Sequence, residues 1–364
     1  MGAYTTVDDP SAHFQTALYS GNGGSNAITF DGNSNMQPDL VWIKCRANAS
    51  TNHYAWDSNR GVHKYISPSQ TATEGDDSAS LTAFGSDGFT MGDGGAEMNH
   101  SDGRNYVGWG WKANGGTTST LTAGSIDSTV QTNSTADFSI ITFTGNGVDG
   151  GNVAHGLSGT WDLLLIKNRD VADDWHVYHK YQADQGQNTG GNLNDNGAFL
   201  ACASSGAGRA TRNGANLINL NDCGDISPIN GSSEKILIYA WKEVRGYSRF
   251  GSYKGNGNTD GEFVYTGFKP AWLIVKNVDT AKYWHMWDIK RSPFNVSDRA
   301  LYPNAGDLED TGLNMDLLSN GFKTRISSGS SGLGNMNTDG DRYIYIAFAD
   351  EPFVTSTGIP CTAR

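Results

Sequence analysis

An aromatic residue followed by an acid recurs in this sequence and is the first candidate for chemistry. The pairs are Trp56-Asp57, Trp287-Asp288 and, in a varied form, Tyr178-His179. A tryptophan face stacks well on a sugar ring, and an adjacent carboxylate accepts hydrogen bonds from sugar hydroxyls. The alternative is a core aromatic beside a carboxylate that pairs with Arg60 or Arg291. Both interpretations stay open on the sequence alone.

The motif Gly-Asn-Gly follows an aromatic residue at three places. Its asparagines are Asn22, Asn146 and Asn256. Glycine adopts positive φ without steric strain, so the motif suits a tight turn after a strand. Asparagine in such a loop also hydrogen-bonds sugar hydroxyls. The motif therefore predicts either three copies of one turn or three copies of a ligand loop.

An acidic, Asn-rich loop near the C-terminus offers oxygen ligands for a cation. Asn337, Asp339 and Asp341 lie close together in it, and calcium takes six to eight oxygens from loops of this kind. The full EF-hand spacing is absent. The loop indicates either a calcium site or an ordinary solvated turn. His176 and His179 would point to opposite faces of a strand, which does not favour a metal site.

No pattern typical of an enzyme occurs. The glutamates are scattered rather than paired as glycan hydrolysis needs, and neither a G-x-S-x-G elbow nor a P-loop is present. The four cysteines are sparse, and no C-x-x-C pair exists, although Cys202 and Cys223 could meet within one domain. The sequence predicts a protein that is not an enzyme and has no cofactor, with calcium as the exception left open.

The charge balance excludes some partners. The formal net charge is −12, the isoelectric point is near 5.0, and lysine and arginine do not cluster, so nucleic acid is not expected as a partner. No run of 18 apolar residues would insert into a membrane. The N-terminal residues do not resemble a secretion signal, and we expect synthesis in a bacterial cytoplasm.

Landmarks around each Gly-Asn-Gly motif repeat in the same order. An apolar run ending in lysine (Lys44, Lys167, Lys276) is followed by the aromatic pair and then by an alternating aromatic strand. A repeat of about 105 residues is longer than a solenoid repeat and suits a self-sufficient domain. The predicted organisation is an arm (1–12), a first repeat (13–112), a Ser/Thr/Gly-rich linker (113–136), a second repeat (137–246), a third repeat (247–353) and a C-terminal arm (354–364).

Each repeat must place these residues on short strands. Glycine-rich turns between brief aromatic and β-branched runs predict an all-β fold, built as three tandem antiparallel β-sandwiches of a jelly-roll, concanavalin-like type. In "ILIYAWK", one face of the expected strand carries Ile236, Ile238 and Ala240. The other face carries Leu237, Tyr239 and Trp241. Both faces are apolar, so this strand should lie in the middle of a sheet or at a contact between domains.

The amino-acid sequence of the third repeat resembles a known family. "GSYKGNGNTDGEFVYTGFKPAWLIVKN", "LLSNGFKTR" and "YIYIAFADEPF" are similar to an uncharacterised repeat-containing structural protein family of marine tailed bacteriophages, including cyanophages, with lectin-like domains. The resemblance covers most of the chain and is weakest over 185–232. It implies a virion protein and assigns no active site.

The expected function is therefore that of a virion structural protein exposed on the particle as a fibre, spike or capsid decoration. It would contact other virion proteins, form a symmetric homo-oligomer (a trimer is favoured) and contribute to attachment to host surface glycans. The terminal arms would dock on a neighbour. Alternatives are a purely architectural component, which should bury its aromatic residues, and an envelope polysaccharide depolymerase, which should show paired carboxylates in a cleft.

Overall fold

Strands dominate the fold. The computed structural model describes residues 4–93, 97–181, 189–201, 209–327 and 336–361. Helices are as short as η1 (Pro10–Ala12) and α3 (Ser227–Asn230). Every pair of neighbouring strands in the sheets is antiparallel. The prediction of an all-β, antiparallel fold is confirmed.

Three larger sheets follow one another along the chain. The first has the order β1 (Phe14–Ser20), β9 (Asn105–Trp111), β3 (Leu40–Cys45), β4 (His53–Asp57), β5 (Lys64–Ile66) and β6 (Gly75–Asp76). The second has the order β10 (Ser119–Leu121), β11 (Ser128–Asn133), β12 (Phe138–Thr144), β20 (Lys235–Trp241), β14 (Leu163–Asn168), β15 (Trp175–His179), β16 (Thr189–Asn192) and β17 (Leu200–Ala201). The third has the order β21 (Ser248–Lys254), β27 (Arg342–Pro352), β23 (Phe268–Asn277) and β24 (His285–Asp288).

A three-stranded sheet accompanies each larger sheet. These small sheets are β2 (Asn26–Thr29), β8 (Gly88–Met91) and β7 (Leu81–Gly85); β13 (Gly151–Ala154), β19 (Leu217–Asn221) and β18 (Arg209–Asn213); and β22 (Phe263–Tyr265), β26 (Gly321–Thr324) and β25 (Met315–Leu318). We call each larger sheet with its small sheet a unit. Unit 1 contains β1–β9, unit 2 contains β10–β20 and unit 3 contains β21–β27.

The central strands of the three larger sheets have the same order and register. In each, the first long strand pairs with the last strand of the unit: Phe14 lies opposite Trp111, Phe138 opposite Trp241 and Ser248 opposite Phe348. The last strand then pairs with the lysine-ending strand, and that strand with the aromatic–acid strand. We call residues counterparts when they hold the same place in this register.

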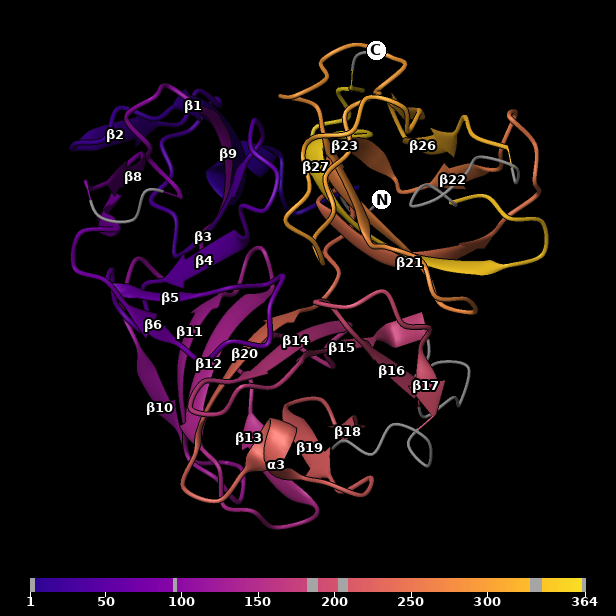
Figure 1. The fold of residues 1–364 in the computed structure, drawn as a ribbon. Coiled ribbons are helices and arrows are strands. Elements are labelled where there is room, and N and C mark those ends of the chain that lie inside the picture. Colours follow the sequence, from indigo (N-terminus) through magenta and orange to yellow (C-terminus); the bar gives the residue numbers. More distant parts are fainter. Residues whose placement is uncertain (1–3, 94–96, 182–188, 202–208, 328–335, 362–364) are drawn as a thin grey trace.

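Each unit is a sandwich with its own core, and a fourth core joins the three units. Buried side chains such as Ile43 and Phe89 in unit 1, or Leu164 and Ile218 in unit 2, fill the space between a larger and a small sheet. The other face of all three larger sheets contributes to one shared cluster, including Trp111, Trp241 and Phe348. Figure 1 shows the three units arranged around this centre, with unit 1 in indigo, unit 2 in magenta and unit 3 in orange to yellow.

Strand β20 meets both expectations drawn from its two apolar faces. It lies in the middle of the second sheet, between β12 and β14. Ile236, Ile238 and Ala240 belong to the core of unit 2. Leu237, Tyr239 and Trp241 belong to the shared core. The alternation therefore marks a strand that is buried on one side by its own unit and on the other by its neighbours.

The stretch expected to be a linker is structured. Within 113–136, β10 and β11 pair with each other and extend the second sheet beyond β12. The small polar and β-branched side chains of β11 suit a strand as well as a linker, and composition alone favoured the linker.

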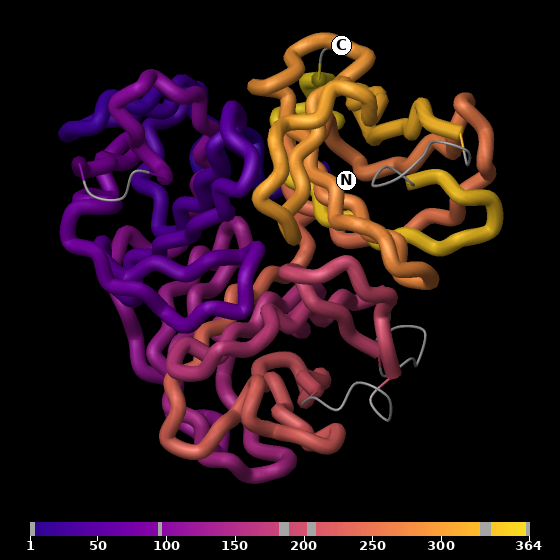
Figure 2. Tube along the Cα trace, viewed as in Figure 1, coloured from indigo at the N-terminus to yellow at the C-terminus, as the bar shows by residue number. Residues whose placement is uncertain are grey.

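The described part of the N-terminal arm packs on its own chain, and its docking on a neighbour stays a prediction. Tyr4 Oη donates to the Gly267 carbonyl (2.8 Å), Thr5 Oγ1 donates to the Arg245 carbonyl (2.7 Å), and Val7 lies in the shared core. Asp8 Oδ1 accepts a hydrogen bond from the Ser356 N–H of the C-terminal arm (2.6 Å). Figure 2 traces the chain in the same view, with unit 1 in indigo to purple and unit 3 in orange to yellow.

Two of the four cysteines are free thiols, namely buried Cys45 and half-buried Cys361. Cys223 is disulfide-bonded, while Cys202 lies outside the described residues. Among the described residues, no helix is long and apolar enough to cross a membrane.

Candidate functional site

The rings of the two Trp-Asp pairs lie in the cores of their own units. Trp56 is 1% exposed and Trp287 is 0% exposed. Trp56 Nε1 donates to Ser80 Oγ (3.3 Å), and Trp287 Nε1 donates to the Leu313 carbonyl (3.0 Å). Neither ring presents a face to solvent, so neither is placed to stack on a sugar.

The carboxylates of the two pairs are buried between units. Each pairs with the arginine three residues later, at 2.5 Å from Arg60 Nε to Asp57 Oδ2 and 2.5 Å from Arg291 Nε to Asp288 Oδ2. Each also accepts a hydrogen bond from another unit. Tyr239 Oη of unit 2 donates to Asp57 (2.8 Å), and Trp109 Nε1 of unit 1 donates to Asp288 (3.1 Å).

These contacts form a closed ring. His179 is the counterpart of the two aspartates in unit 2, and its Nε2 lies 3.2 Å from the Tyr345 carbonyl of unit 3. Unit 2 thus contacts unit 1 at Asp57, unit 1 contacts unit 3 at Asp288, and unit 3 contacts unit 2 at His179. The aromatic–acid position therefore joins the units to one another.

Three counterpart aromatic residues meet at the centre of the ring. The ring centroids of Trp111 and Trp241 lie 6.5 Å apart, those of Trp111 and Phe348 5.7 Å, and those of Trp241 and Phe348 6.3 Å. Only a small apolar cavity of about 30 Å³ remains beside them. Aliphatic and aromatic side chains line this cavity, and it is too small for a ligand, so the centre is a packed core.

Three buried lysines join the same three pairs of units, because each donates a hydrogen bond to a backbone carbonyl of another unit. Lys44 Nζ donates to the carbonyls of Cys45 (2.9 Å), Thr51 (2.8 Å) and, in unit 3, Gly306 (3.3 Å). Lys167 Nζ donates to Val171 (3.4 Å), Asp173 (2.7 Å) and, in unit 1, Thr71 (3.0 Å). Lys276 Nζ donates to Lys282 (2.5 Å) and, in unit 2, Asn196 (3.1 Å).

Burial lowers the pKa of all three lysines. It lowers the pKa of Lys44 and of Lys167 to about 8 and that of Lys276 to about 7. An ammonium group has three N–H donors and a neutral amine has two. Three carbonyls surround each of the first two lysines and two surround Lys276, so the acceptor counts agree with the order of the pKa values.

The loops that reach these lysines add an ion pair at two of the three interfaces. Arg46 pairs with Glu309 (2.7 Å) between units 1 and 3, and Arg169 pairs with Glu74 (2.7 Å) between units 2 and 1. At the third interface an apolar residue, Val278, replaces the arginine, and its carbonyl accepts from the Phe199 N–H (3.0 Å). The backbone bond recurs at all three interfaces, and the charges do not.

The Gly-Asn-Gly motifs are turns held by a buried asparagine. Asn256 Oδ1 accepts from the Asn258 N–H (3.0 Å) within the turn and from Asn337 Nδ2 (3.0 Å), while the Asn256 N–H donates to Asn337 Oδ1 (2.9 Å). The same paired contacts join Asn22 to Asn99 and Asn146 to Asn230. The side-chain acceptor of each motif is used within the fold, which supports the turn interpretation over the ligand loop.

The candidate calcium ligands do not form a common site. Asn337 is 0% exposed, and both ends of its amide are engaged by the turn. Asp341 Oδ2 accepts from Asn277 Nδ2 (2.8 Å), whereas Asp339 is exposed at the surface. Across the residues that the structure describes, no group of three or more His, Cys, Asp or Glu side chains could hold a metal ion. The two histidines of H-x-x-H lie on β15, His179 at the contact with unit 3.

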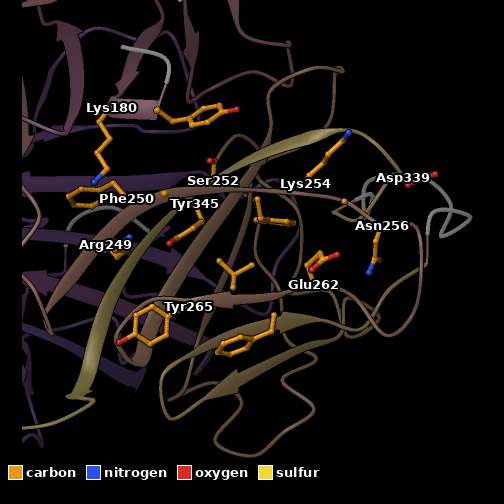
Figure 3. A pocket seen from close by; sticks show the side chains of 16 residues that line it. Lys180, Arg249, Phe250, Ser252, Lys254, Asn256, Glu262, Tyr265, Asp339 and Tyr345 are labelled. Atoms are coloured by element: carbon orange, nitrogen blue, oxygen red, sulfur yellow. The ribbon is translucent and has the colours of Figure 1, made fainter. Parts of the chain in front are cut away.

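A groove in unit 3 has a volume of about 710 Å³. It runs between β21 and β22, which are the edge strands of the larger and the small sheet. Figure 3 shows Lys180 and Arg249 toward one end, Asn256 and Asp339 toward the other, and Tyr265 across from β21. Two of the predicted site residues, Asn256 and Asp339, therefore lie at the rim of the groove.

Charge and aromatic surface are both exposed in this groove. Glu243 pairs with Lys180 and lies 3.9 Å from Arg249, and its Oε1 accepts the Phe250 N–H (2.6 Å). On β22, Phe263 is 45% and Tyr265 is 46% exposed. Burial raises the pKa of Tyr345 on the groove floor to about 12, which keeps its hydroxyl protonated. The groove thus offers a ligand of some length both open space and hydrogen-bonding groups.

Sequence reasoning used the three lysines as landmarks without assigning them a role. The signal was a charged residue at the end of an otherwise apolar, buried run, which requires buried acceptors. The groove left no such signal, because it lies beside β21, an edge strand with no outer partner among the described strands.

Comparisons with known proteins identify a family without a stated activity. A family model described as "Domain of unknown function (DUF7483)" matches residues 9–352. No curated protein and no solved structure matches the chain.

Proposed function

Since the chain belongs to the DUF7483 family, whose description states no activity, we propose from its geometry that it is a non-catalytic, architectural protein of a bacteriophage particle. The observation that carries this proposal is the burial of the recurring aromatic residues and acids. They close a ring of three units by contacts that repeat at each interface. Residues that would have served a glycan or a reaction are committed to the fold.

We further propose that the three units are copies of one jelly-roll-like sandwich domain. The shared strand order of the larger sheets, the identical order of the small sheets and the common register of the first and last strands support this. The counterpart lysines, aspartates and asparagine turns support it independently.

The location on the particle rests on the resemblance of the sequence to phage structural proteins. The protein would lie on the exposed surface of the virion after synthesis in the host cytoplasm, in contact with other virion proteins. Because the inner faces of the three units are occupied within one chain, a symmetric oligomer would form through outer surfaces. Sedimentation of the purified chain, 39.0 kDa as a monomer, measures that state.

Attachment to host glycans is the second candidate function. The observation in its favour is the exposure of Phe263 and Tyr265 on β22, since aromatic faces of this kind stack on sugars.

Binding of the labelled protein to intact candidate host cells, with and without EDTA, separates the two functions. The architectural proposal expects no saturable binding and expects antibodies against the chain to label purified particles. Saturable binding that Tyr265→Ala abolishes would establish attachment instead, and its loss with EDTA would restore a role for calcium. Absence of the chain from particles would contradict both.

A further inference from the structure

What lies beside the outer edge of the first long strand differs among the three units. In unit 2 this strand, β12, is not an edge, because β11 pairs with its outer side: Thr129 lies opposite Thr142, Gln131 opposite Ile140. Since β11 lies within the stretch 113–136 of this same chain, unit 2 shows directly what kind of segment completes the sandwich.

Three sets of neighbours hold β11 in place. Val130 is 4% exposed and points into the core of unit 2. Ile126, just before β11, forms a bridge to Val153 of β13. From unit 1, Asn59 Nδ2 donates to the Thr129 carbonyl (3.2 Å), and Gln131 Nε2 donates to Ser58 Oγ (3.1 Å).

In unit 1 the corresponding edge is covered by a loop. The Gly32 N–H donates to Gln15 Oε1 (2.8 Å), and Gln15 Nε2 donates to the Ser34 carbonyl (2.7 Å). Lys290 of unit 3 pairs with Asp31 of the same loop. A cavity of only about 70 Å³ is left beside β1.

In unit 3 the counterparts of β12, of Val153 and of the unit 1 residues beside β11 line the open groove, whereas β10 has no counterpart among the described residues. β21 stands in the place of β12, Val264 in the place of Val153, and Lys180 and Tyr181 of unit 2 in the places of Ser58 and Asn59 of unit 1. The residues that line the groove are thus counterparts of residues that surround β11 in unit 2. No described residue fills the space between them.

The edge of β21 also presents unused backbone groups. Alternate residues of a strand direct their N–H and C=O groups to the same side. The Tyr247 carbonyl accepts from the Ala349 N–H on the inner side, whereas the Phe250 N–H turns outward to Glu243 Oε1. Ser252 and Lys254 have the phase of Phe250, so their backbone groups face the groove.

We propose that this groove accepts an extended segment of another protein as an additional strand, antiparallel to β21. The incoming segment has an aliphatic or β-branched residue opposite Gly251, in the place of Val130. It has an acidic residue in the place of Gln131, because Lys180 stands in the place of the uncharged Ser58 and Arg249 lies nearby on β21. Both cations lie beside Glu243, and the incoming carboxylate competes with Glu243 for them. This inference does not depend on the particle location proposed above, because it concerns only the groove and its occupant.

The probe is a synthetic peptide with the sequence of residues 126–135 carrying Gln131→Glu. Added to the full chain, it should bind saturably and slow hydrogen exchange in 248–256, where the outward amides of Ser252 and Lys254 become paired. Unchanged exchange of this segment at millimolar peptide would overturn the proposal.

Modified peptides separate backbone pairing from recognition of side chains while leaving the protein unaltered. N-methylation at the Gln131 position removes an N–H that faces β21 and should weaken binding at least tenfold. N-methylation at the Val130 position removes an N–H that faces away and should have little effect. Equal effects at both positions would contradict strand addition.

Protein variants provide the matching control. Ser252→Pro removes an outward N–H of an edge strand, where proline is tolerated, and should abolish peptide binding. Leu18→Pro makes the same change at the counterpart on β1 and should leave binding intact. The opposite pattern would overturn the proposal and identify the groove as a glycan site. In that pattern the peptide does not bind the wild-type chain, and an oligosaccharide binds both the wild type and Ser252→Pro.

Discussion

At the scale of single residues, buried polar groups explain why this sequence repeats particular residues. The landmark lysines and aspartates are buried with hydrogen-bond partners, as a buried polar group requires. The asparagine of each Gly-Asn-Gly motif bonds to a second asparagine that is buried. The sequence identified these residues as special through their recurrence. It could not distinguish a displayed carboxylate from a buried one, because the partners of Asp57 and Asp288 lie in other units, far away along the chain.

Lys276→Met tests the lowered lysine pKa. The pKa of Lys276 is about 7 in the folded chain and 10.5 as its ordinary value. Between these values the unfolded chain binds more protons, so the free energy of unfolding should rise with pH, by about 1.4 kcal/mol per pH unit at most. In urea unfolding, the free energy of unfolding of wild type minus that of Lys276→Met should therefore increase from pH 7 to pH 9. In the Lys44→Met comparison the growth should begin about one pH unit higher. A constant difference would contradict the assignment.

Asn337→Ala tests the turn clasp. Asn337 Nδ2 donates to Asn256 Oδ1 (3.0 Å) and to the carbonyls of Asn258 (2.7 Å) and Ile326 (3.0 Å). Its loss leaves buried groups unpaired and should lower the free energy of unfolding by about 2–4 kcal/mol. Asn258→Ala, at an exposed side chain of the same turn, should change it by less than about 0.5 kcal/mol. Similar effects in denaturant titrations of both variants would argue against the clasp.

At the scale of elements, alternation and turn chemistry predicted the strands well, and the connections poorly. The apolar runs ending in Lys44, Lys167 and Lys276 are central strands, and both faces of β20 are buried as expected. Strand β11 was not foreseen, because "STVQTN" has the composition of a linker and becomes a strand through its contacts with β12 and unit 1. The loops that close the ring carry no periodic pattern that would reveal them.

Glu74→Gln tests one of these loops. Glu74 bridges Arg60 of its own unit (2.9 Å) and Arg169 of unit 2 (2.7 Å) in a largely buried place. Removing its charge leaves buried guanidinium groups without a full partner and should destabilise the chain by about 2–4 kcal/mol in urea unfolding. Asp76→Asn removes the more exposed pair with Lys64 and should have an effect under about 1 kcal/mol. The reverse ranking would show that the interface charges do not stabilise the ring.

At the scale of the whole molecule, the shared core makes the three units depend on one another. Trp111, Trp241 and Phe348 come from different units and pack in one cluster, so no unit retains a complete inner face when another unfolds. The sequence alone indicated a second apolar face on the strand that contains Trp241, but not that three such faces would meet.

Phe348→Ala tests this dependence by calorimetry. Wild type should unfold in one transition, and the variant, which leaves a cavity at the centre, should lose about 3–5 kcal/mol with the entire transition moved to lower temperature. Phe263→Ala, at a 45% exposed ring of the same unit, should leave the transition nearly unchanged. A variant in which only a third of the heat moves would show that the units unfold independently.

Linking the three units in one chain has a consequence for how such a molecule changes over generations. In a trimer of identical chains every mutation appears three times, once in each subunit, so no subunit acquires a surface that the others lack. Here a mutation appears once. The interface at Val278 and Phe199 has a backbone bond where the other two interfaces also have an ion pair, and the groove beside β21 in unit 3 is open among the described residues. A gene of this design can therefore specialise one face of a threefold body while leaving the other two to maintain its shape.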